Sequence, residues 1–558
     1  MTDSILTLED RGTLDPLVAG AKAAGLARAR QEGLPVLPGV VLAAAVSRSY
    51  LDMGMEMLER HGSGRARIAI TSTGLAGDLS AAVARATAAF PFPMVVRSSS
   101  ILEGSGEWSG AFTSYLDIRE GELPKAILGC YASAYTQHTV ERFAAAGVRP
   151  SSAPMAVLVQ PALDPDFGGT ARIRGDEVTI TGVKGSPAPL VQGWDPGVQA
   201  RVSDSVVRGD EAIGTLGEEL LRRVAGLVLE ARDRVGTNSC EWAIQDGTLW
   251  LLQVQIFADV DPGDGIEVPD SFTTPAVAQL GRLIRRHPGP LAEELVLPWA
   301  VADPSLADIS VEPADVDPAD AFQHAAEHAS TLTAEVWASP KPQASGAARS
   351  LLRELRGPEP DTVIRRLAGL RPPDRERAVA VLASLATVRH ELVALGAVTD
   401  PSLAWHVDAA TTQAMLSGQV APTLRGRIGF DRWDPLNAAI VTAHGASVSG
   451  TPVSNGIAFG RMCVVIKPGR AEHFRPRDIV VATHPVPGLA ALLFDAAALV
   501  TTGGGPAAHL FESARALAIP AVCATRIEDL LGALLDQIDV EWALAVDGSR
   551  GSIHGVRW

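Results

Sequence analysis

Cysteine is scarce in this sequence, with four residues in a chain of 558. Cys130, Cys240, Cys463 and Cys523 lie far apart, and none belongs to a Cys-x-x-Cys pair. This spacing excludes a zinc knuckle and a disulfide framework, because both need closely spaced or matched cysteines. We therefore expect four buried thiols in a reducing cytoplasm.

Positive charge and long apolar runs are also lacking. The chain has 48 lysines and arginines against 64 acids, which gives a formal net charge of −16. Nucleic acids and anionic membranes both select a basic surface, so neither is an expected partner. No apolar run reaches the roughly 18 residues that span a bilayer, and Met1–Asp10 is too polar for a secretion signal. The composition is that of a cytoplasmic globular protein large enough for several domains.

Three regions follow one another, and together they predict a multidomain protein of α/β and α+β class. Residues 1–260 alternate strand-like and helix-like stretches. Residues 261–440 begin with a linker rich in Asp, Gly and Pro and continue mainly as helices, the clearest running from Ala378 to Leu395. Residues 441–558 form a compact unit rich in Gly and Val. The sequence leaves the oligomeric state open.

Residue periodicity predicts the individual elements within these regions. Ala338–Ala347 is predicted as an interruption between helices, because it is rich in Pro, Ser and Gly. The predicted strands are Arg67–Thr71, Met94–Arg97, Met155–Gln160, Glu177–Val183, Leu249–Gln255 and Ile519–Val522. The predicted helices are Lys125–Ala144, Leu216–Arg232 and a helix from His509 to about Leu517.

The C-terminal region holds a glycine-rich stretch followed by a histidine. Gly503–Gly505 permit unusual backbone dihedrals and close approach of the backbone. His509 opens the predicted helix, whose dipole disfavours the imidazolium form, so we expect a neutral and nucleophilic ring. The N–H groups at that helix end can hold a phosphoryl group that the ring carries. The stretch therefore predicts a phosphohistidine site, with a structural histidine in a turn as the alternative.

This stretch resembles the phosphohistidine domain of phosphoenolpyruvate synthase, pyruvate phosphate dikinase and rifampicin phosphotransferase. Ser454–Gly460 and Val546–Gly551 resemble the opening and closing segments of that domain. The family places a serine before its histidine, whereas this chain has Ala508 and so lacks that hydroxyl. The positions that match the family pattern are Gly504, Gly505, His509, Ala514, Arg515 and Ile519–Val522. The resemblance implies a swivelling α/β domain in which His509 carries the phosphoryl group and Gly504, Gly505 and Arg515 belong to its loop.

In the N-terminal region, an arginine and a Ser/Gly loop follow a predicted strand, over Val95–Ser100 and Glu103–Gly106. A guanidinium gives forked contacts to phosphate, and such a loop gives backbone donors. This pattern is common among loops, but it resembles the Val-Arg-Ser-Ser segment in the ATP-grasp nucleotide-binding domain of the same dikinase family. Further segments follow in the family's order, namely Ala21–Leu26 with Gly33–Gly39, Cys130–Tyr135, Met155–Gln160, Cys240–Ile244 and Leu249–Gln253.

The resemblance implies ATP and Mg²⁺ as the cofactors. Glu241 and Gln253, on adjacent antiparallel strands, would supply a carboxylate and an amide oxygen, the ligand type that Mg²⁺ prefers. The alternative is that both are solvent-facing polar residues of a hairpin. The residues that the resemblance assigns to ATP or its phosphates are Lys22, Arg97, Ser98, Gln160 and Gln255.

Three departures from the family pattern concern the phosphates. Gln255 stands where the family has a phosphate-contacting arginine, Gly185–Ala188 lacks the family's acid, and the loop at Gly168–Thr170 is shortened. A lost charged contact to a phosphate can cost several kcal/mol in the transition state. Either the ATP chemistry is altered or another cation compensates, the candidates being Arg172, Arg174 and Lys184.

His324 and His328 have the spacing of zinc ligands on a helix. No partnering acidic helix is identifiable in the sequence, so we expect a solvated helix face there. An eightfold βα pattern is also missing, so the pyruvate-binding barrel of the synthases is not expected and pyruvate is not the expected acceptor. The order of domains resembles that of rifampicin phosphotransferase, whose middle domain is longer.

These observations predict an ATP-dependent phosphotransferase that moves a phosphoryl group through His509 to a small organic acceptor, in secondary metabolism or antibiotic modification, and releases AMP and Pi. Two alternatives remain open, a condensing ligase of the prodigiosin-condensing type and a phosphocarrier or degenerate regulatory module. We expect the acceptor to bind where residues 320–437 face the histidine domain. The residues expected there are the apolar stripe Ala378–Leu395, the aromatics Trp405, Phe430 and Trp433, and the phosphate guides Arg389, His390 and Arg425.

Overall fold

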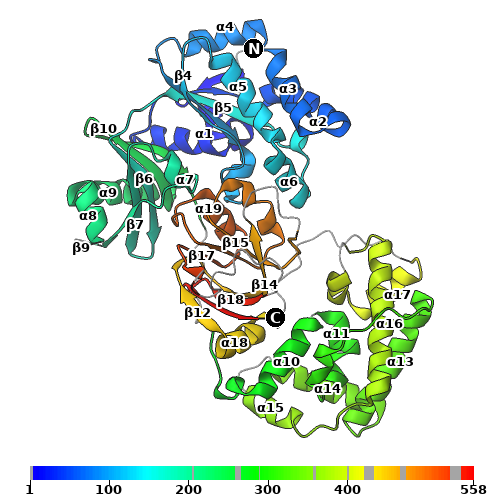
Figure 1. Cartoon of the computed structure of the whole chain (residues 1–558). Helices are drawn as coiled ribbons and strands as arrows, with labels where there is room; N and C mark the ends of the chain where they lie inside the picture. Colours follow the sequence, from blue (N-terminus) through cyan, green and yellow to red (C-terminus); the bar gives the residue numbers. More distant parts are fainter. Residues whose placement is uncertain are drawn as a thin grey trace.

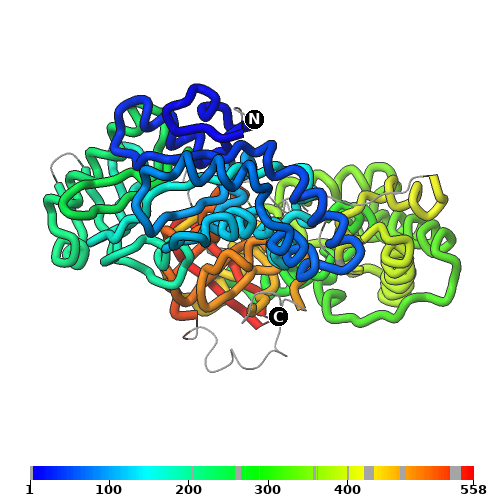
Figure 2. Tube along the Cα trace, turned by 90° about the horizontal axis from the view of Figure 1, so that it is seen from above, coloured from blue at the N-terminus to red at the C-terminus, as the bar shows by residue number. Residues whose placement is uncertain are grey.

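The computed structural model describes a mixed α/β multidomain protein. The described residues are 4–203, 206–257, 265–287, 289–355, 360–398, 401–419, 433–465, 473–527, 529 and 542–557. Figure 1 shows that the C-terminal sheet lies between the N-terminal region and the helical region that precedes it in sequence. Seen from above, the helical region stands to one side of the N-terminal region (Figure 2). Within the described ranges, no helix is long and apolar enough to cross a membrane.

The first part of the N-terminal region is a five-stranded sheet of order β1-β2-β5-β3-β4. Its central strand β5 is buried along six of its seven residues, because it pairs on both sides and helices cover it. The strands are β1 (Ile5–Thr7), β2 (Val40–Leu42), β3 (Met94–Ser100), β4 (Tyr115–Ile118) and β5 (Met155–Pro161). The helices are α1 (Pro16–Gln31), α2 (Arg48–His61), α3 (Ser63–Thr73), α4 (Gly77–Ala86), α5 (Leu123–Ala132) and α6 (Gln137–Ala145).

The second part is a six-stranded antiparallel sheet of order β11-β10-β6-β7-β8-β9, on which α9 packs its apolar face. One hydrophobic core joins α1 of the first part to this sheet and to α9. The strands are β6 (Phe167–Arg174), β7 (Glu177–Lys184), β8 (Val198–Ser203), β9 (Val206–Arg208), β10 (Ser239–Gln245) and β11 (Thr248–Gln255). The helices are α7 (Ala188–Val191), α8 (Asp210–Leu216) and α9 (Glu218–Val235).

The helical unit follows, and its core is built around α13 and α16. Ala378, Leu385 and Leu392 of the predicted apolar stripe are fully buried in this core, whereas Leu395 at its end is 54% exposed. The stripe is therefore mainly packing surface, although Leu382 within it also lines a cavity. The helices are α10 (Pro275–Arg286), α11 (Pro290–Leu295), α12 (Leu297–Ala300), α13 (Pro318–Val336), α14 (Lys341–Leu355), α15 (Pro360–Leu367), α16 (Arg375–Ala394) and α17 (Ala409–Leu416).

The C-terminal histidine unit is an eight-stranded sheet of order β12-β19-β18-β14-β15-β16-β17-β13. Its strands β14 to β17 run parallel, and α18 (Asp434–His444) packs against β14 and β18. Helix α19 (His509–Ala516) begins after the carboxyl end of β16. The strands are β12 (Ala446–Ser449), β13 (Thr451–Ser454), β14 (Ile457–Val465), β15 (Ile479–Ala482), β16 (Ala498–Thr501), β17 (Ala521–Cys523), β18 (Trp542–Asp547) and β19 (Ser552–Arg557).

Two predicted elements are wrong in type. Arg67–Thr71 was expected as a strand because of its β-branched residues, but it lies in helix α3. Ala66 and Ile70, which are four residues apart, are both buried, so tertiary packing of a helical face overrides local β propensity. Gly168–Thr170 was expected as part of a shortened loop, but these residues belong to strand β6. Position 169 needs a glycine, because an added Cβ there would lie 2.1 Å from the Thr181 carbonyl oxygen.

Three predicted helix limits also need correction. The helix expected over Lys125–Ala144 is interrupted by a 3-10 turn at Ser133–Tyr135, so that α5 and α6 are separate. The helix expected over Leu216–Arg232 begins after Gly217, whose φ of 82° ends α8. The interruption expected over Ala338–Ala347 is short, because α14 already begins at Lys341.

Candidate active site

A cavity of about 590 Å³ lies where the two N-terminal sheets meet the histidine unit. Polar and apolar side chains of β3, β5, β10 and β11, together with Lys22 of α1, form its walls, and α19 reaches it from the other side. Such a volume and mixed lining suit a nucleotide. The predicted site residues that line it are Lys22, Arg97, Gln160, Glu241, Gln253 and His509.

Lys22 is brought to the cavity by a kink in α1. Gly20, with φ of 72°, breaks the helical geometry, and an added Cβ there would lie 2.0 Å from the Ser99 carbonyl oxygen. The Ser99 hydroxyl fills the break by donating to the Ala19 carbonyl oxygen and accepting from the Ala23 N–H. Lys22 Nζ then lies 2.6 Å from Oε1 of the buried Glu103. This ion pair holds the ammonium group in place beside the cavity.

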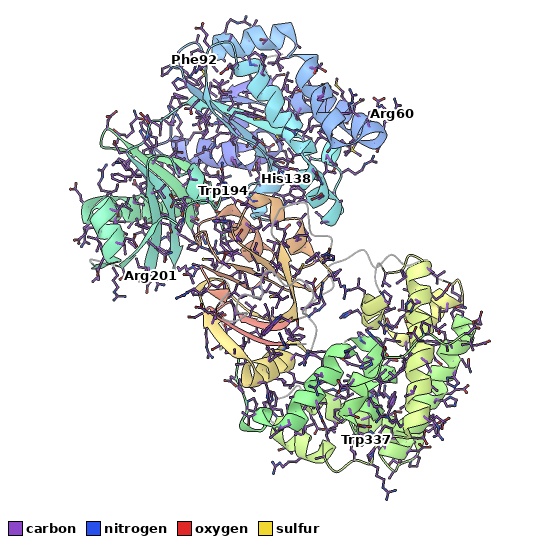
Figure 3. All side chains as sticks on the ribbon, viewed as in Figure 1. Arg60, Phe92, His138, Trp194, Arg201 and Trp337 are labelled. Atoms are coloured by element: carbon purple, nitrogen blue, oxygen red, sulfur yellow. The ribbon has the colours of Figure 1, made fainter. Side chains whose placement is uncertain are left out.

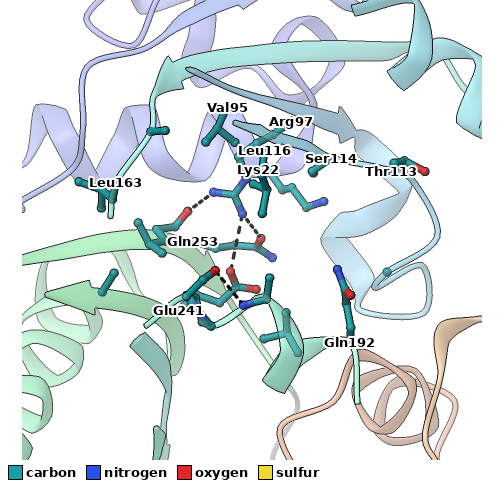
Figure 4. A pocket seen from close by; sticks show the side chains of 18 of the residues that line it. Lys22, Val95, Arg97, Thr113, Ser114, Leu116, Leu163, Gln192, Glu241 and Gln253 are labelled. Carbon is teal, nitrogen blue, oxygen red and sulfur yellow. Dashed lines mark hydrogen bonds and ion pairs between the residues drawn. The ribbon is translucent and has the colours of Figure 1, made fainter. Parts of the chain in front are cut away.

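Arg97 lies at the centre of the polar wall (Figure 4). Its guanidinium donates to the Leu252 carbonyl oxygen at 2.5 Å and to Gln253 Oε1 at 3.1 Å. Glu241 Oε2 lies 3.7 Å from the same guanidinium. The strand pair β10–β11 therefore holds the Arg97 guanidinium at the cavity wall, where a phosphate group could also contact it.

Glu241 and Gln253 are cross-strand partners, and their side-chain oxygens converge on Arg97. Two oxygens from one face of a strand pair fit a Mg²⁺ ion that takes its other ligands from phosphate and water. Among the described residues, no group of three or more His, Cys, Asp and Glu could hold a metal by itself. The donor set thus fits a metal that arrives with a nucleotide better than a resident structural metal.

His509 is held by two residues that the sequence analysis did not single out. Its Nδ1 lies 2.8 Å from Ser109 Oγ and 3.0 Å from Glu512 Oε2, and Ser109 also donates a short hydrogen bond to Glu512. Because both neighbours of Nδ1 can accept a hydrogen bond, we assign the proton of the neutral ring to Nδ1. Nε2 is then the nitrogen with the free lone pair.

The expectation of a histidine kept neutral by the helix dipole needs correction. Burial disfavours the protonated ring, but the hydrogen bond and negative charge of Glu512 outweigh burial and raise the pKa of His509. Burial likewise acts to raise the pKa of Glu512, and the partnership with His509 lowers it overall. The carboxylate one turn along the helix therefore decides the charge of the ring.

The glycine stretch does not line the cavity but forms the contact between the two units. An added Cβ on Gly505 would lie 2.4 Å from the Pro196 carbonyl oxygen, and one on Gly504 would lie 3.1 Å from the Gly193 carbonyl oxygen. Gly110 of the N-terminal region likewise lies close to His509, and an added Cβ on Gly110 would lie 3.0 Å from His509 Cβ. Glycine at these positions lets the units approach closely.

Two arginines brace α19. Arg142 of α6 donates to Ser513 Oγ at 2.8 Å across the contact. Arg515 donates to the carbonyl oxygens of Val453 and Pro506 and so fixes the loop that precedes His509. Burial, together with the positive charges of Arg172 and Arg174, lowers the pKa of Arg515 to about 9. The buried Arg515 side chain thus holds the loop before His509 in place through hydrogen bonds to backbone carbonyl oxygens.

The remaining predicted residues do not line the cavity. Ser98 is fully buried in β3. Gln255 ends β11, where its backbone N–H and carbonyl both bond the Thr237 hydroxyl. Sequence reasoning missed Ser109, Glu512 and His138, the last of which lies on the cavity wall, where the N-terminal region meets the histidine unit (Figure 3). Glu512 could have been found as an acid three residues after the histidine, whereas Ser109 gives no local signal.

The predicted zinc spacing in the helical unit has another explanation. His324 and His328 stack with ring centroids 4.0 Å apart, and His324 Nδ1 lies 3.0 Å from Ser384 Oγ. Both side chains are half-buried, so the expected solvated face is also wrong. Phe430 and Arg425 of the expected acceptor site lie outside the described residues.

Comparison with known proteins supports this arrangement of domains. Residues 17–205 match the family model of the pyruvate phosphate dikinase AMP/ATP-binding domain, and residues 474–551 match that of the PEP-utilising enzyme mobile domain. The prodigiosin synthesizing transferase PigC of Serratia marcescens is 26% identical over 306 residues, which are 54% of this chain and 32% of that protein. An uncharacterized protein of Mycobacterium tuberculosis is 34% identical over 149 residues, 26% of this chain and 16% of that protein. The matches thus cover about a third or less of these relatives.

Proposed function

Because this chain belongs to the phosphoenolpyruvate synthase and pyruvate phosphate dikinase-like family, we propose that it is an ATP-dependent phosphotransferase with His509 as the phosphoryl carrier. One observation carries the proposal. The ring of His509 lines the same cavity as Lys22, Arg97, Glu241 and Gln253, although the chain between them is several hundred residues long. A histidine that reaches into a nucleotide-sized cavity is placed to take a phosphoryl group from ATP.

The chemistry follows from the assigned tautomer. The Nε2 lone pair attacks the β-phosphorus of ATP, a nitrogen–phosphorus bond forms, and the bond to the α-phosphate oxygen breaks with its electron pair leaving on AMP. Water then removes the γ-phosphate as Pi, and one phosphoryl group stays on Nε2. Lys22 and Arg97 stabilise the charge on the phosphate oxygens. Mg²⁺ held by Glu241 and Gln253 would neutralise further phosphate charge.

The nitrogen that gains a bond becomes positively charged unless Nδ1 loses its proton. Glu512 and Ser109, both in contact with Nδ1, stabilise that positive charge while the phosphoryl group is transferred. This role resembles that of a carboxylate that orients a catalytic histidine. It also explains why a buried carboxylate lies beside the ring.

The products of the first half-reaction test the proposal. With ATP labelled in the β-phosphate the label should appear on the protein, and with ATP labelled in the γ-phosphate it should appear as free phosphate. AMP should accumulate in step with Pi. ADP as the sole nucleotide product would overturn the β-phosphoryl pathway, because it would mean that only the γ-phosphate moves.

The acceptor is a small organic molecule, and its site in the helical unit remains a prediction. In this arrangement His509 faces the N-terminal cavity, so transfer to an acceptor elsewhere requires the histidine unit to leave and turn, as rigid-body domain movements allow. Chasing the labelled protein with fractions of a cell metabolite pool would identify the acceptor by loss of label. A fraction that removes label without ATP present contains it.

A condensing ligase is the second candidate, and the match to prodigiosin synthesizing transferase over 54% of this chain favours it. In that case phosphorylation activates one partner, and the phosphate leaves as the new bond forms between the two partners. The chase experiment separates the candidates. A phosphorylated acceptor supports phosphotransfer, whereas free phosphate together with a product of combined mass supports condensation.

A further inference from the structure

A second cavity, of about 450 Å³, lies between the helical unit and the histidine unit. Helices α10 and α16 form one wall, and the start of β15 with part of β14 forms the other. Six arginines and two aspartates line this space, which we call the arginine cavity. The arginines are Arg285, Arg286, Arg389, Arg461, Arg475 and Arg477, and the aspartates are Asp434 and Asp478.

The charge of the arginine cavity is opposite to that of the whole chain. Arg461 pairs with Asp478 at 2.9 Å and Arg477 with Asp434 at 2.6 Å, so each acid is already engaged by one arginine. Among the described residues that line the cavity, arginines outnumber acids by four, in a protein of net charge −16. Burial and the nearby Arg389 lower the pKa of His287 to about 4, so this histidine adds no charge at neutral pH. Cations gathered around one space attract an anion strongly.

Two of the guanidinium groups, those of Arg389 and Arg285, lie against aromatic rings. Arg389 lies 4.5 Å from the centre of the Trp405 ring, and its Nε donates to the Pro401 carbonyl oxygen. Arg285 lies 5.9 Å from the centre of the Phe459 ring. Guanidinium groups that are already oriented lose less entropy on binding and give forked contacts to phosphate. Part of the positive charge of the cavity is thus oriented before any anion binds.

Asn437 gives an independent indication of a ligand. Its side chain lines the cavity and is only 3% exposed, and its Oδ1 has no hydrogen-bond partner among the described residues. A buried carbonyl oxygen without a partner is unfavourable, and a hydroxyl group of a bound molecule would satisfy it. The occupant therefore needs negative charge and a hydrogen-bond donor in one small molecule.

The arginine cavity cannot receive the phosphoryl group from His509 of the same chain. Arg477 and Asp478 directly precede β15, and Arg461 directly precedes the part of β14 that pairs with β15, whereas His509 follows the carboxyl end of β16. The strands between them are four residues long, which corresponds to about 13 Å. Because this wall moves with His509 in any rigid-body swing, the distance persists. The site is therefore separate from phosphotransfer.

We propose that the arginine cavity binds a small phosphate ester bearing a hydroxyl group, which joins the helical unit to the histidine unit and favours the arrangement with His509 in the nucleotide cavity. The ligand would contact arginines of both units at once. Its binding free energy is then available only while the two units stay together. Binding is expected whether or not the phosphotransferase proposal holds, since no residue of the nucleotide cavity takes part.

The test uses the full-length protein without ATP, titrated by calorimetry with glycerol 3-phosphate, inorganic phosphate and citrate at constant ionic strength. We expect saturable binding of glycerol 3-phosphate at least tenfold tighter than that of the other two. The variant R286Q/R475Q removes two exposed charges from opposite walls and should weaken this binding at least tenfold. The matched control R282Q/R526Q removes two exposed arginines outside the cavity and should bind like the wild type.

Absence of saturable binding, equal affinity for citrate, or equal weakening in both double variants would overturn the site. The effect on His509 is measured separately. Saturating glycerol 3-phosphate should increase the single-turnover rate of ATP-dependent labelling at least twofold in the wild type and leave it unchanged in R286Q/R475Q. If binding is seen but the labelling rate does not respond, the coupling between the sites is refuted.

Discussion

Ser109 Oγ of the N-terminal region lies 2.8 Å from Nδ1 of His509 in the histidine unit, although 400 residues separate them in sequence. The position directly before the histidine, where the resemblance led us to expect a serine, is Ala508, and it makes no side-chain cap for α19. The hydroxyl beside the ring is thus supplied by the other unit. It is available to His509 only while the two units are in contact.

Replacing Ser109 by alanine should therefore slow the phosphorylation of His509 without unfolding the protein. One hydrogen bond contributes about 1 kcal/mol, which corresponds to about a fivefold lower single-turnover labelling rate. Ser109→Thr keeps the hydroxyl and should recover much of the rate. Ser105→Ala removes an exposed hydroxyl of the same loop and serves as the control. Equal rates in Ser109→Ala and Ser105→Ala would refute a role for Ser109.

Glu512 should set the pH dependence of labelling. The pKa of His509 is raised above its ordinary value by Glu512, and only the neutral ring is nucleophilic. The labelling rate of the wild type should therefore fall as the pH drops through a pKa above 6.5. In Glu512→Gln the carboxylate that raises the pKa of His509 is gone, so burial lowers this pKa. The fall of the labelling rate on the acid side should therefore occur at lower pH than in the wild type. An acid limb at the same pH in both proteins would contradict this assignment.

Glu241 should connect Mg²⁺ to ATP binding. In the wild type, added Mg²⁺ should strengthen the binding of ATP, and Glu241→Ala should lose this effect and label His509 at least about 100-fold more slowly. Circular dichroism should show an intact fold, since the side chain lies at a cavity wall. Glu230→Ala, at an exposed carboxylate of α9, is the control. Labelling at the wild-type rate in Glu241→Ala would remove Glu241 from the site.

A substitution at Gly505 should weaken docking of the histidine unit without affecting the binding of ATP. In Gly505→Ala the new Cβ would lie 2.4 Å from the Pro196 carbonyl oxygen, so the units must move apart. Overpacking of this kind costs about 1–3 kcal/mol, and labelling should slow about tenfold or more while the affinity for ATP stays unchanged. Gly226→Ala adds a Cβ that meets no atom within 4 Å and is the control. Unchanged labelling in Gly505→Ala would show that this contact is not needed.

The resemblance to the dikinase family, more than local chemistry, indicated much of the candidate site. It singled out Arg97 on a strand, Glu241 opposite Gln253 and His509 at the start of a helix, and these four residues line one cavity. Strands β5, β7 and β11 were likewise predicted to within one residue at each end, because their apolar runs are clear.

Contacts between units could not be predicted in this way. No pattern in the sequence connects Ser109 to His509 or Gly505 to Pro196, because each pair is formed only by the docking of separate units. Helix α3 was missed for a related reason, since Ile70 is buried by packing of α3 against α2 and α5, which its own segment does not reveal. Tertiary packing decides such cases, and local propensity is overruled.

The central claim is that His509 takes a phosphoryl group from ATP, and one measurement tests it most directly. The wild type and His509→Ala are incubated with Mg²⁺ and ATP labelled in the β-phosphate, with His61→Gln, at an exposed histidine of α2, as the control. The account predicts label that is acid-labile and stable to base in the wild type and in His61→Gln, and none in His509→Ala. The same label on His509→Ala, or no label on any of the three proteins, would contradict it.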